Sequence, residues 1–350
     1  MGKRFKRHKA IGLFDKDFRL DKLSKLGDPL ERLGQGVDFE LFRELLTDGL
    51  AKLAKGQGGR PPYDYVLMFK ILILQRYYNL SDDQAEFQIC DRLSFMRFLN
   101  LAISDDVPDS KTIWNFREQL TSLGLVESLF EAFLKQLEAL GLVVNQGKII
   151  DASFVEVPKQ RNNREDNKKI KSGEVPEQWK GQPHKRSQKD TDARWTKKNF
   201  QNYYGYKNHV KTCGKSKIIT KYVVTDASVH DSQTMDGLLE KEKDQGEELY
   251  ADSAYTGEKQ EESIRKNEMV DRVCEKGYKN APLTPEQKVG NKEKSKTRVR
   301  VEHIFGFMEN SMNGMYVKVI GIQRVSAMVG LMNLTYNMFR KIQLTAPVVG

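Results

Sequence analysis

One stretch of this chain decides its fold: Lys148-Ile149-Ile150-Asp151-Ala152-Ser153. The apolar and β-branched pattern continues to Val157, so the sequence predicts a short, largely buried strand over 148–157. Asp151 lies in the middle of that strand. Because a buried carboxylate is costly unless it is paired or bound to a cation, Asp151 is either a capping side chain at a turn or part of a functional site.

Two more carboxylates stand in comparable places further along the chain. Asp252 directly follows a predicted strand over 247–251, and Glu302 lies in a segment with helical periodicity. Ligands bind at the carboxyl ends of strands in open sheets, although a simple helix cap also explains Asp252. Arg298 precedes Glu302 by one helical turn and shares its face, away from the apolar stripe. We therefore expect the three carboxylates to converge.

The residue types in this set indicate which cation they would hold. Carboxylate oxygens suit Mg²⁺ or Mn²⁺, whereas zinc would prefer Cys and His. Three such side chains can hold two ions about 3.5–4 Å apart, an arrangement that serves in-line displacement at phosphorus. The chain as a whole carries a formal charge of +10 and has a pI of about 9.2, which favours a polyanionic partner. The combination points to metal-dependent phosphodiester chemistry on nucleic acid.

Composition narrows the class of protein further. Hydrophobic residues make up 39% of the chain, enough to build a core. No run of about 20 apolar residues is present, so no membrane partner is expected, and the basic start at 1–9 lacks the apolar stretch of a secretory signal. The three cysteines are far apart and form no CxxC pair, which indicates a reduced, cytosolic compartment.

The hydrophobic pattern changes character at about residue 146. Residues 1–145 read as an all-α region for DNA binding or dimerisation, and residues 146–345 read as an α/β catalytic domain with a mixed sheet and flanking helices. The expected helices lie at 65–78, 82–92, 112–123, 126–140, 232–242, 257–267, 301–312 and 328–342. The expected strands lie at 148–157, 203–212, 217–225, 247–251 and 269–274.

A basic insertion interrupts the second region at about 158–200. Residues 159–200 hold thirteen Lys and Arg against six Asp and Glu and show no periodicity, so we expect a loop that touches DNA. Lys197 and Lys198 would neutralise phosphates. The pair Arg194-Trp195 would contact a base, or Trp195 would pack against the core. In the helical region, Lys111 and Arg117 would face DNA if 81–123 forms a helix-turn-helix-like unit; a dimerisation scaffold explains the same pattern.

Several local runs carry a resemblance to a known family. The order Asp, Asp, Glu on strand, strand and helix resembles the DDE insertion-sequence transposases with a ribonuclease H-like core, and the runs resemble the insertion-sequence-five group. These runs are Gly59-Arg60-Pro61-Pro62-Tyr63-Asp64, Pro108-Asp109-Ser110-Lys111-Thr112-Ile113-Trp114, Asp192-Ala193-Arg194-Trp195-Thr196-Lys197-Lys198, Tyr204-Gly205-Tyr206-Lys207-Asn208-His209-Val210, Val229-His230-Asp231-Ser232 and Tyr250-Ala251-Asp252-Ser253-Ala254-Tyr255.

The resemblance implies a set of residue roles. Asp151, Asp252 and Glu302 would be the catalytic, metal-binding triad, and Arg298 would contact phosphate. The family pattern Tyr-x2-Arg-x3-Glu-x6-Lys is only half kept, since Ser295 replaces the Tyr and Glu309 the Lys. The residues expected to supply phosphate contacts instead are Lys294, Lys296 and Arg300. Those expected to support the site are His230, Asp231 and Tyr255, although Asp231 most simply caps the following helix and Tyr255 could equally pack in the core.

The function implied by the resemblance is transposition. Such an enzyme cleaves double-stranded DNA at terminal inverted repeats and joins the ends to target DNA, working as a homodimer in the cytosol of a bacterium or archaeon, associated with the nucleoid. Two alternatives remain open at this point: a related nuclease without strand transfer, and a domesticated DNA-binding protein without catalysis.

Overall fold

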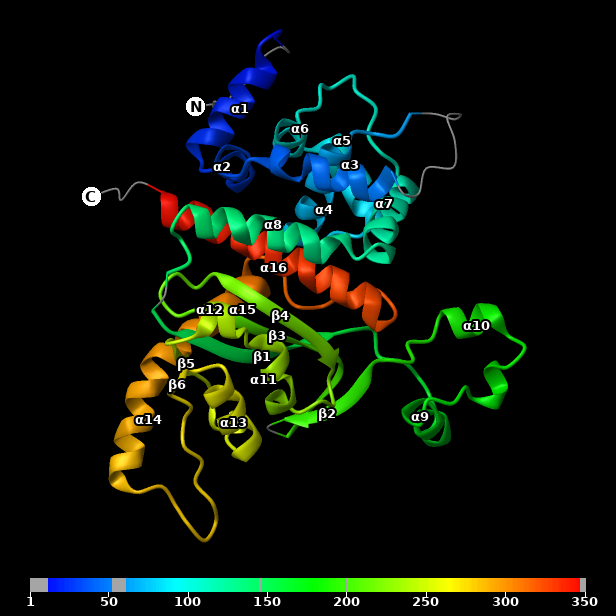
Figure 1. The fold of residues 1–350 in the computed structure, drawn as a ribbon. Helices are drawn as coiled ribbons and strands as arrows, with labels where there is room; N and C mark the ends of the chain where they lie inside the picture. Colours follow the sequence, from blue (N-terminus) through cyan, green and yellow to red (C-terminus); the bar gives the residue numbers. More distant parts are fainter. Residues whose placement is uncertain (1–11, 52–60, 145, 199, 347–350) are drawn as a thin grey trace, which may run out of the picture.

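A bundle of helices lies against one face of a mixed β-sheet (Figure 1). The computed structural model describes residues 12–51, 61–144, 146–198 and 200–346. A lobe that contains α9 (Arg164–Lys171) and α10 (Pro183–Ser187) projects from the sheet side of the molecule, and so does the long helix α14 (Pro285–Arg298). Gly59 and Arg60 of the first family-like run, and the basic start of the chain at 1–9, lie outside the described residues.

The helical region begins its helices at polar caps that precede apolar runs. The Asp64 carboxylate accepts from the Leu67 amide at the start of α4, and Ser81 forms a reciprocal capping box with Gln84 at the start of α5. Asp109 caps α7. The helices predicted here are confirmed. The bounds are α1 (Asp15–Lys25), α2 (Pro29–Gly36), η1 (Phe39–Phe42), α3 (Arg43–Ala51), α4 (Tyr65–Tyr78), α5 (Asp82–Asp91), α6 (Leu93–Leu99), α7 (Ser110–Ser122) and α8 (Leu125–Ala139).

The sheet is built around β1, which runs antiparallel to β3 on one side and parallel to β5 on the other. Its order is β2-β3-β1-β5-β6, and β4 pairs antiparallel with β3. Asp151 lies opposite Val210 in this register. The predicted strands are confirmed as β1 (Lys148–Glu156), β3 (Gln201–Cys213), β4 (Ile219–Asp226), β5 (Glu248–Tyr250) and β6 (Val270–Asp271), and β2 (Arg194–Lys198) adds one that was not predicted.

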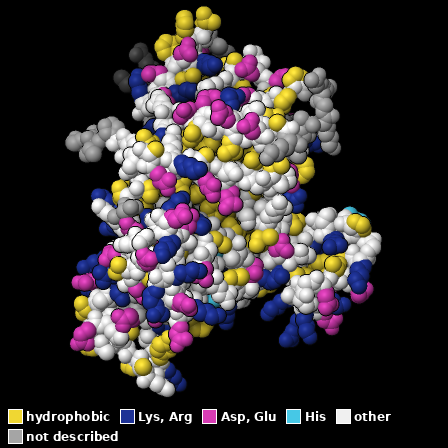
Figure 2. All heavy atoms as spheres, viewed as in Figure 1, with side chains coloured by type: hydrophobic (Ala, Val, Ile, Leu, Met, Phe, Trp, Pro, Cys, Tyr) yellow, Lys and Arg dark blue, Asp and Glu magenta, His cyan; other side chains and the backbone are white. Residues whose placement is uncertain are grey.

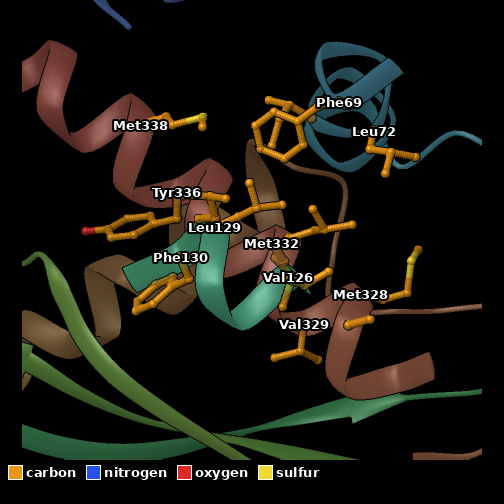
Figure 3. Close-up of a cluster of buried hydrophobic side chains, with 14 of the residues drawn as sticks. Phe69, Leu72, Val126, Leu129, Phe130, Met328, Val329, Met332, Tyr336 and Met338 are labelled. Atoms are coloured by element: carbon orange, nitrogen blue, oxygen red, sulfur yellow. The ribbon is translucent and has the colours of Figure 1, made fainter. Parts of the chain in front are cut away.

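One long helix joins the sheet to the helical region. α16 (Ile322–Thr345) packs against α4 and α8 on one side and β4 on the other. Phe130, Val329 and Met332 belong to one continuous buried cluster that spans both regions (Figure 3). Two buried polar links fix the docking, since Asn333 bonds Asn208 and Asn337 bonds the backbone of Ile219. The core is therefore shared across the boundary expected at residue 145, and that division into domains stays a prediction.

The opposite face of the sheet carries a smaller core. Ile150 and Leu249 pack there with Met235 and Ile264 from the helices that follow β4. The helix predicted at 232–242 is wrong, because Leu239 is extended and the chain breaks there. That break lets Leu238 and Leu239 enter the core while Glu240 bonds Lys211. The elements are η3 (Asp231–Thr234), α11 (Met235–Leu238), α12 (Lys241–Asp244), η4 (Ser253–Tyr255) and α13 (Glu258–Lys266).

The last part of the chain before α16 supplies a helix that the sequence did not predict. α14 (Pro285–Arg298) starts at a capping box between Thr284 and Gln287, with Pro285 in its first turn. It continues through η5 (Val299–Val301) into α15 (Glu302–Asn310), so Arg298 and Glu302 lie at the join of two helices. The helix predicted at 301–312 is confirmed, ending two residues early.

The basic insertion forms a lobe of short helices: α9 (Arg164–Lys171), η2 (Glu177–Trp179) and α10 (Pro183–Ser187). Trp179 is its buried centre, and Lys189 lies over the indole ring. Asp190 ties the base of the lobe to the sheet by accepting from the Tyr206 hydroxyl at 2.7 Å. Lys and Arg side chains gather at the end of the lobe over α9 (Figure 2). The expected unstructured loop is thus wrong in part, because the lobe has a small core of its own.

Candidate active site

Asp151 lies on β1 with its side chain mostly but not fully buried, and this changes its acidity. Burial raises the pKa of its carboxyl to about 6, and the nearby negative charge of Asp252 adds to that effect. A hydrogen bond from the Ala152 amide at 2.8 Å and the positive charges of Arg298 and Lys198 act in the opposite direction. The two predicted aspartates are therefore close enough to interact, and the negative charge at this point is only partly compensated.

Arg298 connects the strand to the helix. Its guanidinium donates to the Asp151 carboxylate at 3.3 Å and to the Glu302 carboxylate at 3.4 Å. The Asp151 side chain is 16% exposed and the Glu302 side chain 57% exposed, so the bridge runs from the interior to the surface. Arg298 thus links Asp151 and Glu302 through one guanidinium, and the full convergence of the three carboxylates stays a prediction. Asp252 caps η4 by accepting from the Ala254 amide at 2.7 Å, which was the simpler expectation for it.

The three predicted ligands suit a divalent cation by their chemistry, but their carboxylates are not grouped closely enough to bind one as they stand. Every predicted ligand offers carboxylate oxygen, the donor that Mg²⁺ and Mn²⁺ prefer, and Asp151 lacks full charge compensation. In the part of the chain that the structure describes, however, no three His, Cys, Asp or Glu side chains are grouped tightly enough to hold a metal ion. The guanidinium of Arg298 lies between Asp151 and Glu302, so both carboxylates would have to leave it to share an ion.

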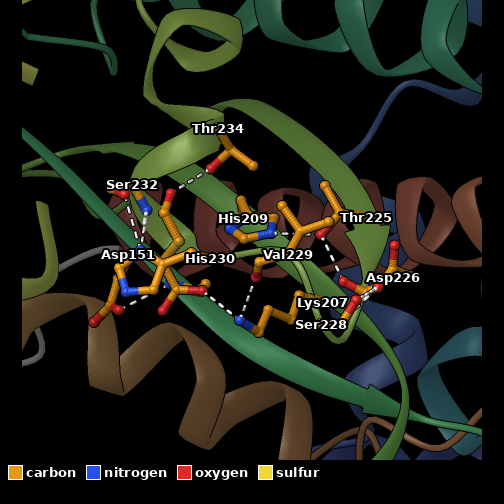
Figure 4. A network of polar contacts seen from close by, with 12 residues as sticks. Asp151, Lys207, His209, Thr225, Asp226, Ser228, Val229, His230, Ser232 and Thr234 are labelled. Atoms are coloured by element: carbon orange, nitrogen blue, oxygen red, sulfur yellow. Dashed lines mark hydrogen bonds and ion pairs between the residues drawn. The ribbon is translucent and has the colours of Figure 1, made fainter. Parts of the chain in front are cut away.

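A second polar network lies beside the first and involves a predicted supporting residue. Lys207 of β3 donates to the Asp231 carboxylate and to the Val229 carbonyl, both at 2.7 Å (Figure 4). The Asp231 carboxylate therefore pairs with the Lys207 ammonium. The side chain that caps η3 is that of His230, whose Nδ1 accepts from the Ser232 amide. His230 is exposed, and a local turn accounts for its contacts.

His209 stands on the same strand face as Lys207, two residues along β3. Its Nε2 lies 2.9 Å from the Thr225 hydroxyl, and its Nδ1 is a buried atom with no hydrogen-bond partner among the described residues. Burial lowers the pKa of His209 to about 4, so the ring is neutral at physiological pH.

Tyr255 lies in η4, three residues after Asp252. It is 1% exposed and packs in the smaller core with Ile150, so the core interpretation of this residue holds for its ring. Its hydroxyl is buried and bonds to no group within the described residues. Burial and the negative charges of Asp151, Asp231 and Asp252 raise the pKa of this phenol well above its usual value. Within the described residues, this phenol is thus a buried proton donor without an acceptor, and the charges of the three carboxylates act on it.

The residues expected to contact DNA fall into three groups. Lys111 is exposed in the first turn of α7. Around the site, Lys294 donates to the Val273 carbonyl and Arg300 to the Gly214 carbonyl, each at 2.9 Å, and Lys296 lies in the last turn of α14. The third group lies on the β2–β3 hairpin, where the Arg194 side chain donates to the Thr191 carbonyl. The Trp195 side chain is 46% exposed, and its ring contacts that of Tyr204. The Lys197 ammonium lies over the Phe200 ring and the Lys198 ammonium over the Phe154 ring.

One DNA-contact expectation is corrected. Arg117 is 7% exposed, and its two terminal nitrogens bond the Asp82 carboxylate at 2.5 and 2.8 Å. This bidentate pair joins α7 to α5 inside the helical region. The sequence pattern placed Arg117 on a DNA-facing surface because the apolar stripe of α7 did not show that α5 would cover that side.

Lys207 and the aromatic residues near it were not predicted as site residues. Lys207 lies inside a run that carried the family resemblance, and strand alternation places it on one face with Tyr203 and His209. This alternation could have identified Lys207, because a lysine on a buried strand face needs a carboxylate partner.

A mixed sheet with flanking helices, acidic residues on β1 and after β5, and a glutamate on a following helix define the ribonuclease H-like class of catalytic cores. The chain belongs to the family described as "Transposase DDE domain", whose model matches residues 144–338. A second model, described as "Transposase domain (DUF772)", matches residues 18–119. The protein is accordingly a DDE-type DNA transposase, and members of this family generally use divalent metal ions.

One solved structure is also similar to this chain. It is the piggyBac transposase synaptic complex with hairpin DNA, which aligns with 12% sequence identity and a TM-score of 0.45 over 92% of this chain and 76% of that chain. Separately, no helix of the described segments has both the length and the hydrophobicity to span a membrane.

Proposed function

We propose that Asp151, Asp252 and Glu302 are the catalytic residues of this transposase and bind its metal ions, Mg²⁺ or Mn²⁺, as a pair. The observation that carries this assignment is the buried, under-compensated Asp151, which interacts with Asp252 and is joined to Glu302 through Arg298. When bound, the ions would activate water or a DNA 3′-hydroxyl and stabilise the leaving oxygen.

The chain's own residues have separate roles in this proposal. Arg298 leaves its two carboxylates for a DNA phosphate, which can accept from both terminal nitrogens at once. The Tyr255 hydroxyl donates into the acidic region once a ligand supplies an acceptor there. Asp231 acts through Lys207, which it holds in place at 2.7 Å.

The DNA-binding surface in this proposal includes residues near the acidic site, on the β2–β3 hairpin and on α7. Its cations are Lys111, Lys197, Lys198, Lys294, Lys296, Arg194 and Arg300, with Trp195 as an aromatic contact. The substrate would be double-stranded DNA that carries terminal inverted repeats, together with target DNA. We further propose a homodimer as the active form and the cytosol, at the nucleoid, as its place of action. The net charge of +10 supports the DNA partner.

Strand transfer is the step that separates this function from simple nuclease activity. A labelled duplex with a pre-formed 3′-hydroxyl end, carrying the DNA that flanks the gene, is incubated with plasmid and Mg²⁺, Mn²⁺ or no divalent ion. The proposal expects covalent joining to plasmid with either ion and none without. Cleavage without joining under every condition would favour the nuclease alternative.

A further inference from the structure

Phe200 lies in the turn of the β2–β3 hairpin and is surrounded by solvent. Lys198 and Gln201 form the last residue pair of the hairpin, and Phe200 lies between them in the chain. Phe200 is 95% exposed, the largest exposed fraction of any large apolar residue in the described segments. Because the ring is not buried by its own chain, hydrophobic packing within the fold does not explain a phenylalanine at this position.

The backbone at Phe200 adds a second cost. Its φ is +65°, in the left-handed region. Gly, Asn and Asp adopt this conformation in turns with little strain, whereas a bulky side chain is disfavoured there. Asn79, Asn100 and Asn313 have φ values of the same sign, and Phe200 is the one aromatic residue with such an angle among the described residues. A small polar residue would therefore suit the isolated fold better than this ring.

Two lysines flank the ring, one from each face of the hairpin. Lys197 and Lys198 are neighbours on β2, so strand alternation directs their side chains to opposite faces. Their ring contacts agree with this, because the Lys197 ammonium lies 5.7 Å from the Phe200 ring centre and the Lys198 ammonium lies 5.9 Å from that of Phe154 on β1. Both lysines are exposed. The turn is thus an apolar point with a positive charge on each side.

The strands behind the turn are anchored. β2 is the outermost strand in the sheet order, and the Trp195 ring packs against that of Tyr204 with centroids 5.0 Å apart. Two residues further along β3, the Tyr206 hydroxyl donates to Asp190 at the base of the lobe at 2.7 Å. A binding side chain acts most precisely when rigid elements support it. The anchored hairpin can therefore hold a bound partner in a deformed shape.

Duplex DNA matches an apolar point that lies between two cations. Each groove of the duplex has a phosphate strand on either side, and apolar side chains of DNA-bending proteins insert between base steps from a groove. The net charge of +10 favours a polyanion of this kind. An anionic membrane surface is a weaker match, because membrane binding increases with the apolar area that is buried, and a single ring supplies little.

We propose that Phe200 is a wedge that inserts between adjacent base pairs of duplex DNA and bends it, while Lys197 and Lys198 pair with the phosphates on the two sides of the groove. The inference rests on the proposed function, since it says how one part of that DNA-binding surface engages its substrate. TA steps are flexible and are opened at low cost, whereas A-tracts are stiff. The wedge therefore gives a preference for DNA with TA steps without a hydrogen bond to any base edge.

The test compares two duplexes in EDTA, where no metal-dependent cleavage occurs. Each has about 20 base pairs and a donor and acceptor dye at its two ends; one has central TA steps and the other is an A-tract. Phe200→Asn removes the ring, and Phe200→Leu is the matched control that keeps an apolar side chain. Wild type and Phe200→Leu should bind the TA duplex at least about fivefold more tightly than the A-tract and raise the energy transfer between its ends. Phe200→Asn should bind the two duplexes within about twofold of each other and leave the energy transfer unchanged.

Two controls separate the wedge from other roles of the hairpin. Phe200→Asn should melt at or above the wild-type temperature, because asparagine tolerates the left-handed conformation. Its binding to the A-tract also shows that the variant is folded. Lys197→Gln and Lys198→Gln should each weaken binding to both duplexes alike and lower the salt dependence by about 0.9, while the bend remains.

Three results would overturn the wedge. The first is a TA preference and energy transfer in Phe200→Asn equal to those of wild type, and the second is a lower melting temperature of that variant, which would assign the ring to the stability of the hairpin. The third is wild-type DNA binding by Phe200→Asn together with lost binding to vesicles of phosphatidylcholine and phosphatidylglycerol, which would assign the ring to a membrane. Failure of the proposed function would appear elsewhere, as absent metal-dependent joining with the TA preference intact.

Discussion

Replacing Asp151 with asparagine should stabilise the protein at neutral pH when no divalent ion is present. Burial raises the pKa of Asp151 from its ordinary value to about 6. A shift of about two units corresponds to about 3 kcal/mol, which is the unfavourable free energy of keeping this carboxylate charged in the folded state. An asparagine side chain has a similar shape and no charge, so Asp151→Asn avoids that cost.

The pH dependence fixes the sign of the effect. The folded-state pKa lies above the unfolded value, so between about pH 4 and pH 6 the folded protein binds more protons than the unfolded chain. The stability linked to this carboxyl is therefore present below about pH 4 and is lost as pH rises through 6. The difference in unfolding free energy between Asp151→Asn and wild type should be small at pH 4 and approach about 3 kcal/mol at pH 8.

Urea unfolding in EDTA at pH 4, 6 and 8 measures this difference directly. Asp48→Asn on the exposed surface of α3 is the matched control and should show no comparable gain at pH 8. An Asp151→Asn variant that is less stable than wild type at pH 8, or a gain that does not change with pH, would refute the reasoning. It would mean that the bond to Arg298 outweighs burial at this position.

Three further predictions test other parts of the structure. Arg298→Gln should bind Mg²⁺ more tightly than wild type in calorimetry without DNA, because the guanidinium competes for the Asp151 and Glu302 oxygens; weaker binding would contradict this. Asn333→Ala should lower the unfolding free energy by about 1–3 kcal/mol, because it leaves the buried Asn208 amide without its hydrogen-bond partner. Replacing both Asn208 and Asn333 with alanine should recover part of that loss. Gly205→Ala should lower the melting temperature, because its φ of +143° and the Val155 carbonyl leave no room for a β-carbon; an unchanged melting curve would show that β1 can shift.

Local pattern was enough to predict the elements that carry the site. Hydrophobic periods of two or about 3.6 residues, together with flanking caps, placed Asp151 on a strand, Asp252 after a strand and Glu302 on a helix. The structure confirms these three placements. The capping box at Ser81 and Gln84 was equally readable, because both partners lie within one turn.

Contacts between distant segments were not readable in this way. Arg117 pairs with Asp82 and Lys207 with Asp231 across separate elements, and no periodicity reports which helix covers which. α14 was missed because its apolar stripe is weak: it has no buried residue, and its capping box rather than its packing marks its start. The helix breaks at Leu239 because Leu238 and Leu239 pack into the smaller core while Glu240 pairs with Lys211, and local propensity does not report these contacts.

The most direct test of the central claim compares wild type with Asp151→Asn, Asp252→Asn and Glu302→Gln. A duplex carrying the DNA that flanks the gene is assayed with Mg²⁺ for cleavage and joining, and with EDTA for binding. The account predicts that each variant loses cleavage and joining by several orders of magnitude while its DNA affinity stays near wild type. Cleavage at the wild-type rate by any one of the three would contradict the assignment of that carboxylate to the metal-dependent active site.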